Sequence, residues 1–99
     1  MRIISVKTLR EFWEQPQYRD AEDPLKAWYW ETKHANWEKP TDVKAHFGDA
    51  SIIRNKRVVF NIAGNKYRLL VKIHYNKGII FIRFVGTHKE YDKIDVETF

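Results

Sequence analysis

The second half of the chain carries three strand-like runs separated by very short loops. The runs "RVVFNI" (57–62), "YRLLVKIHY" (67–75) and "IIFIRFV" (79–85) are rich in β-branched and aromatic residues. Ala63-Gly64-Asn65-Lys66 joins the first pair and Asn76-Lys77-Gly78 joins the second pair, and both segments are typical of hairpin loops. This pattern predicts a three-stranded antiparallel meander.

The first half follows a helical period instead. Residues 2–6 are expected to form a short strand, and apolar side chains then recur three and four positions apart. Three helices are predicted: one capped by Ser5 or Thr8 and stopped or kinked at Pro16, one with Asp23 as N-cap and Pro24 at its first position, and one from Thr41-Asp42 to Gly48. The C-terminal "KIDVETF" is expected to be a short helix or a last edge strand.

With helices first and strands second, the chain predicts one α+β domain over residues 1–99. The expected architecture is a short N-terminal strand with two to three helices packed on one face of an antiparallel β-sheet. A chain of 99 residues forms a core large enough to fold without disulfide bonds or a structural metal ion. The absence of cysteine excludes disulfides, zinc–thiolate sites and thiol nucleophiles, and it fits the reducing cytoplasm.

The sequence lacks the motifs of several other function classes. The sequence has no glycine-rich phosphate loop, no dinucleotide fingerprint and no nucleophile elbow. None of the four histidines pairs with another at the spacing of a metal-binding helix, so no metal and no cofactor is expected. No signal peptide is recognised, and no apolar run approaches the ~20 residues of a membrane span. The net charge of +5 favours a polyanionic partner such as nucleic acid, although it also suits plain solubility.

Polar residues inside the predicted sheet are the first site candidates. If Ile62 pairs with Tyr67, Asn61 lies directly opposite Arg68 on one face. Arg83 interrupts a very apolar strand, and it either packs its stem while the guanidinium reaches a carboxylate or water, or it binds an anion. A two-residue turn before that strand puts Arg83 on the face of Arg68, whereas a three-residue loop with a bulge puts it on the other.

The stretch "THKEYD" (87–92) that follows the third strand is either a solvated strand end or a site. The imidazole of His88 suits proton transfer at neutral pH. Cations nearby are suited to hold a phosphate and to stabilise its developing charge. The remaining candidates are Lys89 as a cation beside Arg83, Glu90 as a base, Tyr91 as a hydrogen-bond or stacking partner, and Asp92 as the group that orients His88. Together they supply what RNA cleavage by its own 2′-hydroxyl requires.

Two blocks of the sequence resemble the HigB-type toxins of bacterial type II toxin–antitoxin systems, within the RelE-like superfamily. The shared frame runs over Phe60-Asn61-x-x-Gly64-Asn65-x-Tyr67-Arg68, then Ile82-Arg83, then Thr87-His88-x-Glu90-Tyr91-Asp92. The resemblance extends from Arg2 to about Ile94 and is most specific in the second half. It implies the small RelE-like RNase fold, in agreement with the architecture predicted from periodicity.

The resemblance also implies an activity and a set of partners. Such toxins are cytoplasmic, metal-independent endoribonucleases that cut mRNA, typically on the translating ribosome, and so inhibit translation and growth. A helix-turn-helix antitoxin of the HigA type neutralises the toxin, and the toxin meets DNA only through it. A non-catalytic basic module that binds RNA or the ribosome is the alternative function.

The implied site residues follow by position in the shared frame. His88 is the acid/base candidate, Arg68 and Arg83 are the phosphate contacts, and Tyr91 belongs to the same end of the sheet. The expected RNA contacts in that part of the chain are Asn61, Lys89 and Asp92. The basic charge adds Arg54, Lys56 and Arg57, which lie outside the shared frame and are equally well read as ordinary solvated cations. Trp30 and Trp37 are expected at the surface, on the antitoxin or a neighbouring helix.

Overall fold

Five strands form one mixed sheet in the order β1-β5-β4-β3-β2, in a computed structural model that describes residues 1–99. The strands are β1 (Arg2–Ile4), β2 (Ser51–Ile52), β3 (Arg57–Ile62), β4 (Tyr67–His74) and β5 (Ile79–Thr87). β1 lies parallel to β5 and all other neighbours are antiparallel. The predicted meander is confirmed. The short β2 was not anticipated, and the parallel β1 makes the sheet mixed.

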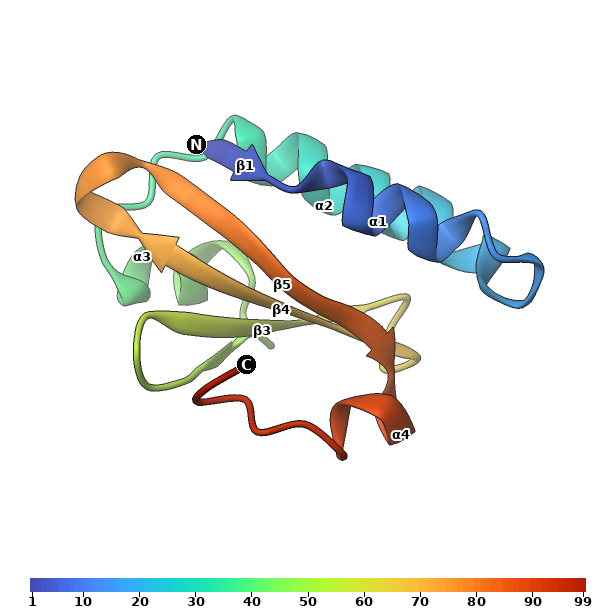
Figure 1. The fold of residues 1–99 in the computed structure, drawn as a ribbon. Coiled ribbons are helices and arrows are strands. Elements are labelled where there is room, and N and C mark those ends of the chain that lie inside the picture. The colour runs from blue at the N-terminus through green and yellow to red at the C-terminus, as the bar shows by residue number, and fades with distance from the viewer.

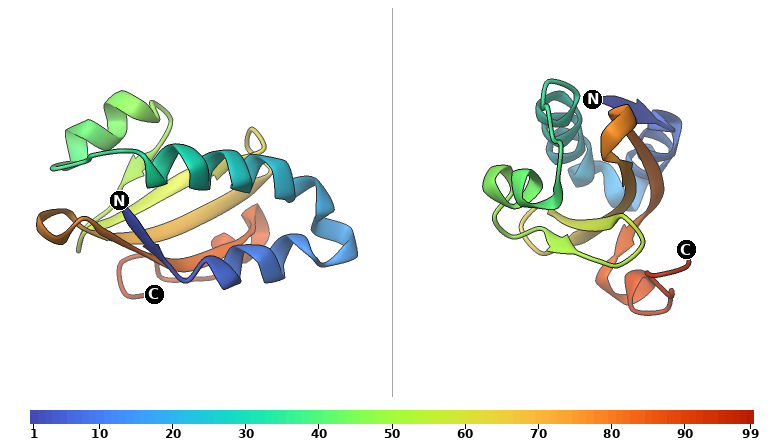
Figure 2. Two further views of the ribbon diagram at one scale, coloured as in Figure 1. Left: turned by 90° about the horizontal axis from the view of Figure 1, so that it is seen from above. Right: turned by 90° about the vertical axis from the view of Figure 1, so that its left-hand side faces the viewer.

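Helices cover one face of this sheet. They are α1 (Val6–Trp13), the 3₁₀ segment η1 (Pro16–Ala21), α2 (Glu22–Lys33) and α3 (Pro40–His46). A short 3₁₀ turn, η2 (Tyr75–Lys77), joins β4 to β5, and α4 (His88–Tyr91) follows β5. Figure 1 shows α1 to α3 on one side of the sheet, with α4 and the C-terminal segment on the other. The two further views in Figure 2 show the same two-sided arrangement.

Two predicted helix starts are wrong. Asp23 is not an N-cap, because η1 runs straight into α2, which begins at Glu22. The third helix begins at Pro40 rather than at Thr41-Asp42. The carboxylate of Asp42 still serves that helix end, since it accepts hydrogen bonds from the backbone N–H groups of Glu38 and Lys39 at 2.9 and 3.2 Å.

The core lies between the helices and the sheet. Phe60 of β3 is at its centre, with the rings of Trp28, Trp37 and Phe47 packed around it at centroid distances of 5.3, 6.1 and 5.2 Å. Trp37 is only 4% exposed, so its expected place at the surface is wrong. Trp30 is 64% exposed, as its position off the apolar stripe predicts.

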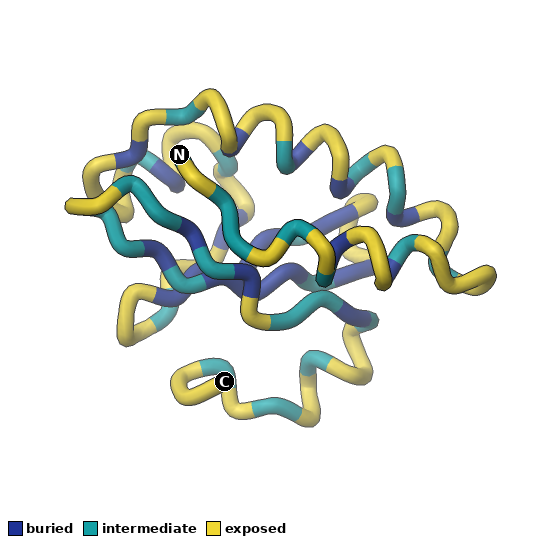
Figure 3. The backbone as a smooth tube through the Cα atoms, turned by 45° about the horizontal axis from the view of Figure 1, so that its top comes forward, coloured by how far each residue is buried: buried dark blue, intermediate teal, exposed yellow.

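The sheet has a second face that the helices leave open. Alternate residues of β4 point into the core, and the residues between them point the other way. We call this side the open face, and on β3 and β4 it carries Asn61, Arg68, Leu70, Lys72 and His74. Figure 3 shows β3 and β4 largely buried, while the C-terminal segment alternates between exposed and half-buried positions.

The C-terminal segment crosses the open face as turns and bends, so it is neither of the two expected structures. Its ends are held by specific contacts. The Phe99 ring meets the Phe84 ring edge-on at 5.6 Å, and the side-chain amide of Asn55 donates to the backbone carbonyl of Glu97 at 3.1 Å. Part of the open face is therefore covered by the chain itself.

Candidate active site

Arg68 and His88 meet at one end of the open face. The register pairs Asn61 with Arg68 across β3 and β4, as predicted, and pairs Arg68 with Gly86 across β4 and β5. Two residues beyond Gly86 the chain enters α4, whose first residue is His88. Arg68 Nη2 contacts His88 Nε2, and Arg68 Nη1 donates to the carbonyl of Asn65 at 3.5 Å.

The contact sets His88 Nε2 against a group that only donates hydrogen bonds. Nε2 of His88 is therefore the acceptor nitrogen of this contact. A neutral imidazole with an unprotonated Nε2 is the form that accepts a proton from a hydroxyl. Both side chains lie at the surface, His88 exposed and Arg68 half-buried, so a polyanion reaches them from solvent.

The start of α4 is fixed by a reciprocal cap. Thr87 Oγ1 accepts a hydrogen bond from the Glu90 backbone at 3.2 Å, and Glu90 Oε1 accepts one from the Thr87 backbone at 2.8 Å. Glu90 is thus engaged in holding the helix, which argues against its role as a base. The cap sets the direction in which His88 leaves the strand.

Gly86 makes room for this cap. A Cβ at position 86 would lie 2.6 Å from Cζ of Phe84 and 3.0 Å from Oε1 of Glu90. The Phe84 ring and the capping carboxylate therefore share the space that only a glycine leaves free. The sequence shows Gly86 as the end of an apolar run, but it does not show this close approach.

Tyr91 lies half-buried on α4 near Arg68. Burial raises the pKa of its hydroxyl; the nearby Arg68 charge acts in the opposite direction, and Asp92 raises the pKa further. The hydroxyl is therefore protonated at neutral pH, and Tyr91 is a hydrogen-bond donor rather than a base.

Arg83 is separated from this pair. The loop Tyr75–Gly78 joins His74 to its partner Ile79, and the register then shifts between Leu70 and Val71, which leaves Arg83 without a partner on β4. Its Nε donates to the carbonyl of Phe99 at 3.1 Å, so it reaches the C-terminal segment on the open face. Arg83 is three residues before Gly86, about 10 Å along the strand. The bulge, and not the turn alone, sets its direction.

Three other candidates surround the Arg68–His88 pair without joining it. Asn61 donates through Nδ2 to the backbone carbonyl and a carboxylate oxygen of Asp49, both at 3.3 Å. Lys89 is exposed on α4. The Asp92 carboxylate makes no hydrogen bond to His88, whose Nε2 contacts Arg68 instead. Only the Asp92 backbone touches His88, through its N–H to the carbonyl at 3.0 Å.

The cations predicted further upstream lie at the other end of β3. Arg57 pairs with Lys72, four residues from the Asn61–Arg68 pair and therefore about 13 Å away. Arg57 is only 6% exposed, which excludes the alternative of an ordinary solvated cation there, while Arg54 and Lys56 are exposed in the β2–β3 turn. Lys72 and His74 were overlooked, although the alternation in "YRLLVKIHY" places them on the face of Arg68.

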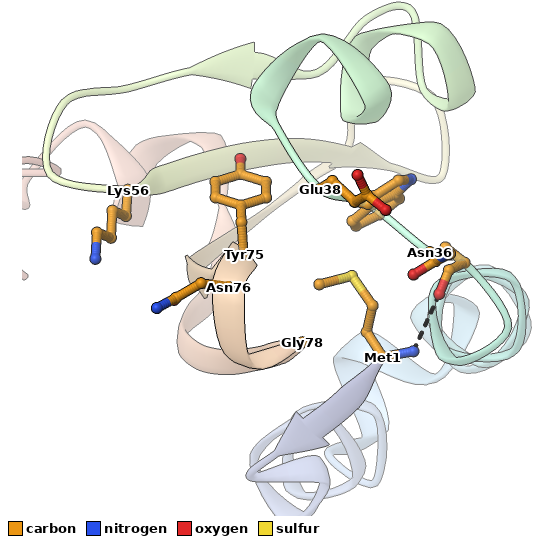
Figure 4. A pocket seen from close by; sticks show the side chains of 9 residues that line it. Met1, Asn36, Glu38, Lys56, Tyr75, Asn76 and Gly78 are labelled. Carbon is orange, nitrogen blue, oxygen red and sulfur yellow. Dashed lines mark hydrogen bonds between the residues drawn. The ribbon is translucent and has the colours of Figure 1, made fainter.

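The largest cavity, about 670 Å³, is remote from His88. Figure 4 shows Met1, Tyr75 and Asn76 around it, beyond the far end of β4. No three His, Asp or Glu side chains gather where they would hold a metal ion. No helix has the length and apolar character of a membrane span.

Comparison with known proteins gives one consistent result. Residues 21–94 match the family model HigB_toxin, described as the RelE-like toxic component of a toxin-antitoxin system. The chain is 32% identical over 95 residues to the mRNA interferase toxin HigB of Escherichia coli strain K12, covering 93% of this chain and 88% of that protein. Proteins named mRNA interferase HigB from Escherichia coli O157:H7 and Shigella flexneri match with the same identity and coverage.

Proposed function

Because the chain belongs to the HigB family of RelE-like toxins, we propose that it is the toxic half of a toxin–antitoxin pair and acts as an endoribonuclease on mRNA. The observation that carries the proposal is the contact between Arg68 and the Nε2 nitrogen of His88. It joins a cation for phosphate to an imidazole for proton transfer on one accessible surface.

The reaction that suits this pair uses the 2′-hydroxyl of the RNA as nucleophile. His88 Nε2 accepts the proton of that hydroxyl while its oxygen forms a bond to phosphorus. The bond from phosphorus to the 5′-oxygen breaks, that oxygen takes a proton from solvent water, and His88 returns its proton to solvent. The products are a 2′,3′-cyclic phosphate and a 5′-hydroxyl end. Arg68 turns from His88 to the phosphate, where its fixed charge balances the negative charge that grows in the transition state.

Tyr91 serves as a donor in this scheme. Its raised pKa keeps the phenol protonated at neutral pH. The hydroxyl is thus suited to hydrogen-bond a phosphate oxygen or the departing 5′-oxygen, and the ring offers a face for stacking a base.

The other cations hold the strand rather than the reacting phosphate. Arg83 is about 10 Å along β5 from the residue opposite Arg68, so it suits a neighbouring phosphate. Lys89 projects from α4 beside His88 and is suited to the same task. Asn61 helps to shape the floor beside Arg68, and Asp92 flanks Tyr91.

The partners follow from the family. The antitoxin is proposed to be a helix-turn-helix protein of the HigA type, through which alone the toxin meets DNA. The message is proposed to be cut in the cytoplasm while it is being translated, so ribosomal RNA is a further contact.

The decisive experiment is induced expression followed by mapping of transcript 5′ ends, with and without a block of translation. New 5′-hydroxyl ends that appear only while translation runs support the whole proposal. Ends that persist under the block support the nuclease and remove the need for the ribosome. Growth arrest with intact messages would instead identify a non-catalytic module that binds RNA or the ribosome.

A further inference from the structure

A second basic pocket lies on the open face at the end opposite His88. It has a volume of about 460 Å³ and no apolar residue in its lining. Its cations are Lys56 from the β2–β3 turn, Arg57 at the start of β3 and Lys72 on β4, and His74 completes the basic side. The only carboxylate in the lining is that of Glu97 from the C-terminal segment. Three fixed positive charges therefore face one negative charge.

Arg57 is the most buried of these cations. It is 6% exposed, its Nη1 donates to the carbonyl of Asn55 at 3.2 Å, and its Nε is buried without a partner. No ion pair in the molecule involves Arg57 or Lys72. A buried cation without a counter-charge is costly, and a bound anion removes that cost.

The pKa of His74 reflects the same surplus of positive charge. Burial lowers the pKa of its imidazole, and the charges of surrounding lysines lower it further (Lys56, Lys72 and Lys77). The residues of the pocket thus repel additional positive charge and favour an anion.

The turn that carries Lys56 has an unusual backbone. Asn55 and Lys56 have φ values of +60° and +63°, the left-handed pair of a hairpin turn. Glycine is the usual residue at the second of these positions, and a side chain there carries strain. A lysine stands at this position and lines the pocket.

We propose that this pocket is a second RNA site, in which Lys56, Arg57 and Lys72 bind a backbone phosphate of the strand whose scissile phosphate lies at Arg68 and His88. The inference rests on the proposed function, because that function names the polyanion. Lys72 and Arg68 are on the same face of β4, four residues and about 13 Å apart. Leu70 between them is fully buried, so a strand that reaches both cations passes beside the covered part of the open face. The contact positions the RNA without reading its sequence.

Glu97 competes with the phosphate for this pocket. Its carboxylate lies 3.7 Å from Arg54 Nε, and its backbone is held by Asn55. RNA must displace that carboxylate or bind beside it. Removal of the charge by Glu97→Gln is therefore expected to tighten RNA binding about threefold.

The test measures binding and not cleavage. A fluorescent 2′-O-methyl RNA strand has no free 2′-hydroxyl and stays intact, so its dissociation constant is read from anisotropy over a range of salt concentrations. Lys72→Met keeps the stem of the side chain and removes the charge. It should weaken binding about three- to tenfold and lower the salt slope by about 0.7, the value of one phosphate contact on a single strand.

The matched control is Lys7→Met on α1, an exposed lysine of the helical layer. Equal dissociation constants and equal salt slopes for Lys72→Met and Lys7→Met would overturn the proposal. So would a pocket variant that binds RNA normally but loses binding to an oligoglutamate peptide, because the site would then recognise an acidic protein segment.

Transcript mapping is independent of this binding assay. If messages are cut and Lys72→Met binds RNA as tightly as wild type, the second RNA site is refuted and the nuclease stands. If messages stay intact and Lys72→Met binds RNA more weakly than wild type, the nuclease is refuted and the second site stands.

Discussion

Arg68 Nη2 contacts His88 Nε2 although 20 positions separate the two residues in the sequence. The contact arises because Arg68 pairs with Gly86 across β4 and β5, and the chain turns into α4 immediately beyond. The arrangement places an imidazole nitrogen and a cation within reach of the same phosphate. It is the centre of the proposed nuclease site, and the first prediction concerns it.

His88→Ala should lower the rate of mRNA cleavage about a hundredfold to ten-thousandfold, because general acid–base catalysis at that position is lost. The melting temperature should change little, since the side chain is exposed. The matched variant is His34→Ala at the end of α2, which should leave cleavage intact. Quantitative mapping of 5′ ends from cells with equal toxin levels measures both. Undiminished cleavage by His88→Ala would show that His88 is not the proton-transfer group.

Arg83→Ala should affect RNA binding more than chemistry. The guanidinium is exposed and bonds only the carbonyl of Phe99, so the free energy of unfolding should fall by about 0.5 kcal/mol or less. Affinity for the 2′-O-methyl strand should fall several-fold, and cleavage should fall with it. Arg10→Ala on the exposed side of α1 serves as the control. An effect on stability larger than the effect on RNA binding would contradict this role.

Gly86→Ala should destabilise the fold and disturb the site together. The new Cβ meets Phe84 at 2.6 Å and the capping carboxylate of Glu90 at 3.0 Å, so one of them must move. We expect a loss of about 1 to 3 kcal/mol in urea unfolding, as for other overpacked positions, and reduced cleavage because α4 shifts. Gly48→Ala is the matched control, because nothing lies within 4 Å of a Cβ there. Equal stability of the two variants would refute the close packing.

Lys56→Gly should make the protein more stable and a poorer RNA binder. Glycine relieves the left-handed backbone at φ +63°, which stabilises the fold by about 1 kcal/mol. Lys56→Ala removes the same charge and keeps the strain, so the two variants should bind RNA equally weakly and differ only in unfolding. Wild-type RNA affinity in both variants would show that Lys56 does not contact the strand.

Asp20 should give the fold a component of stability that is lost in acid. Hydrogen bonds from Lys66 and from Tyr67 lower the pKa of this carboxyl below its ordinary 3.8. A lowered folded-state pKa stabilises the protein above the unfolded value and ceases to do so as the pH falls through the folded value. The difference in unfolding free energy between wild type and Asp20→Asn should be constant from about pH 5 to pH 7 and shrink below 3.8.

The control for this prediction is Asp23→Asn, whose carboxylate accepts no hydrogen bond. The pH dependence of its difference from wild type is the baseline against which that of Asp20→Asn is read. Denaturant titrations at a series of pH values measure both variants. A difference for Asp20→Asn that stays constant down to pH values well below 3.8 would rule out the proposed coupling between η1 and the loop before β4.

Helix starts were less predictable than strands. The capping pattern at Asp23 and Pro24 is locally sound, yet η1 feeds directly into α2 and makes the cap unnecessary. Trp37 was expected at the surface, but it packs beside Phe60 because the chain between α2 and α3 folds over β3. In both cases a contact with a distant segment overrode a local preference.

The sequence by itself determined the meander, the pairing of Asn61 with Arg68 and the family of the chain. These depend on side-chain alternation and loop length, which act over a few neighbouring residues. Only the tertiary structure decided that Arg68 contacts His88, that a bulge leaves Arg83 without a partner on β4, and that Glu97 lies in a basic pocket on the same face. These arrangements depend on how strand register, a local bulge and the returning C-terminal segment pack together, and no short stretch of sequence contains that information.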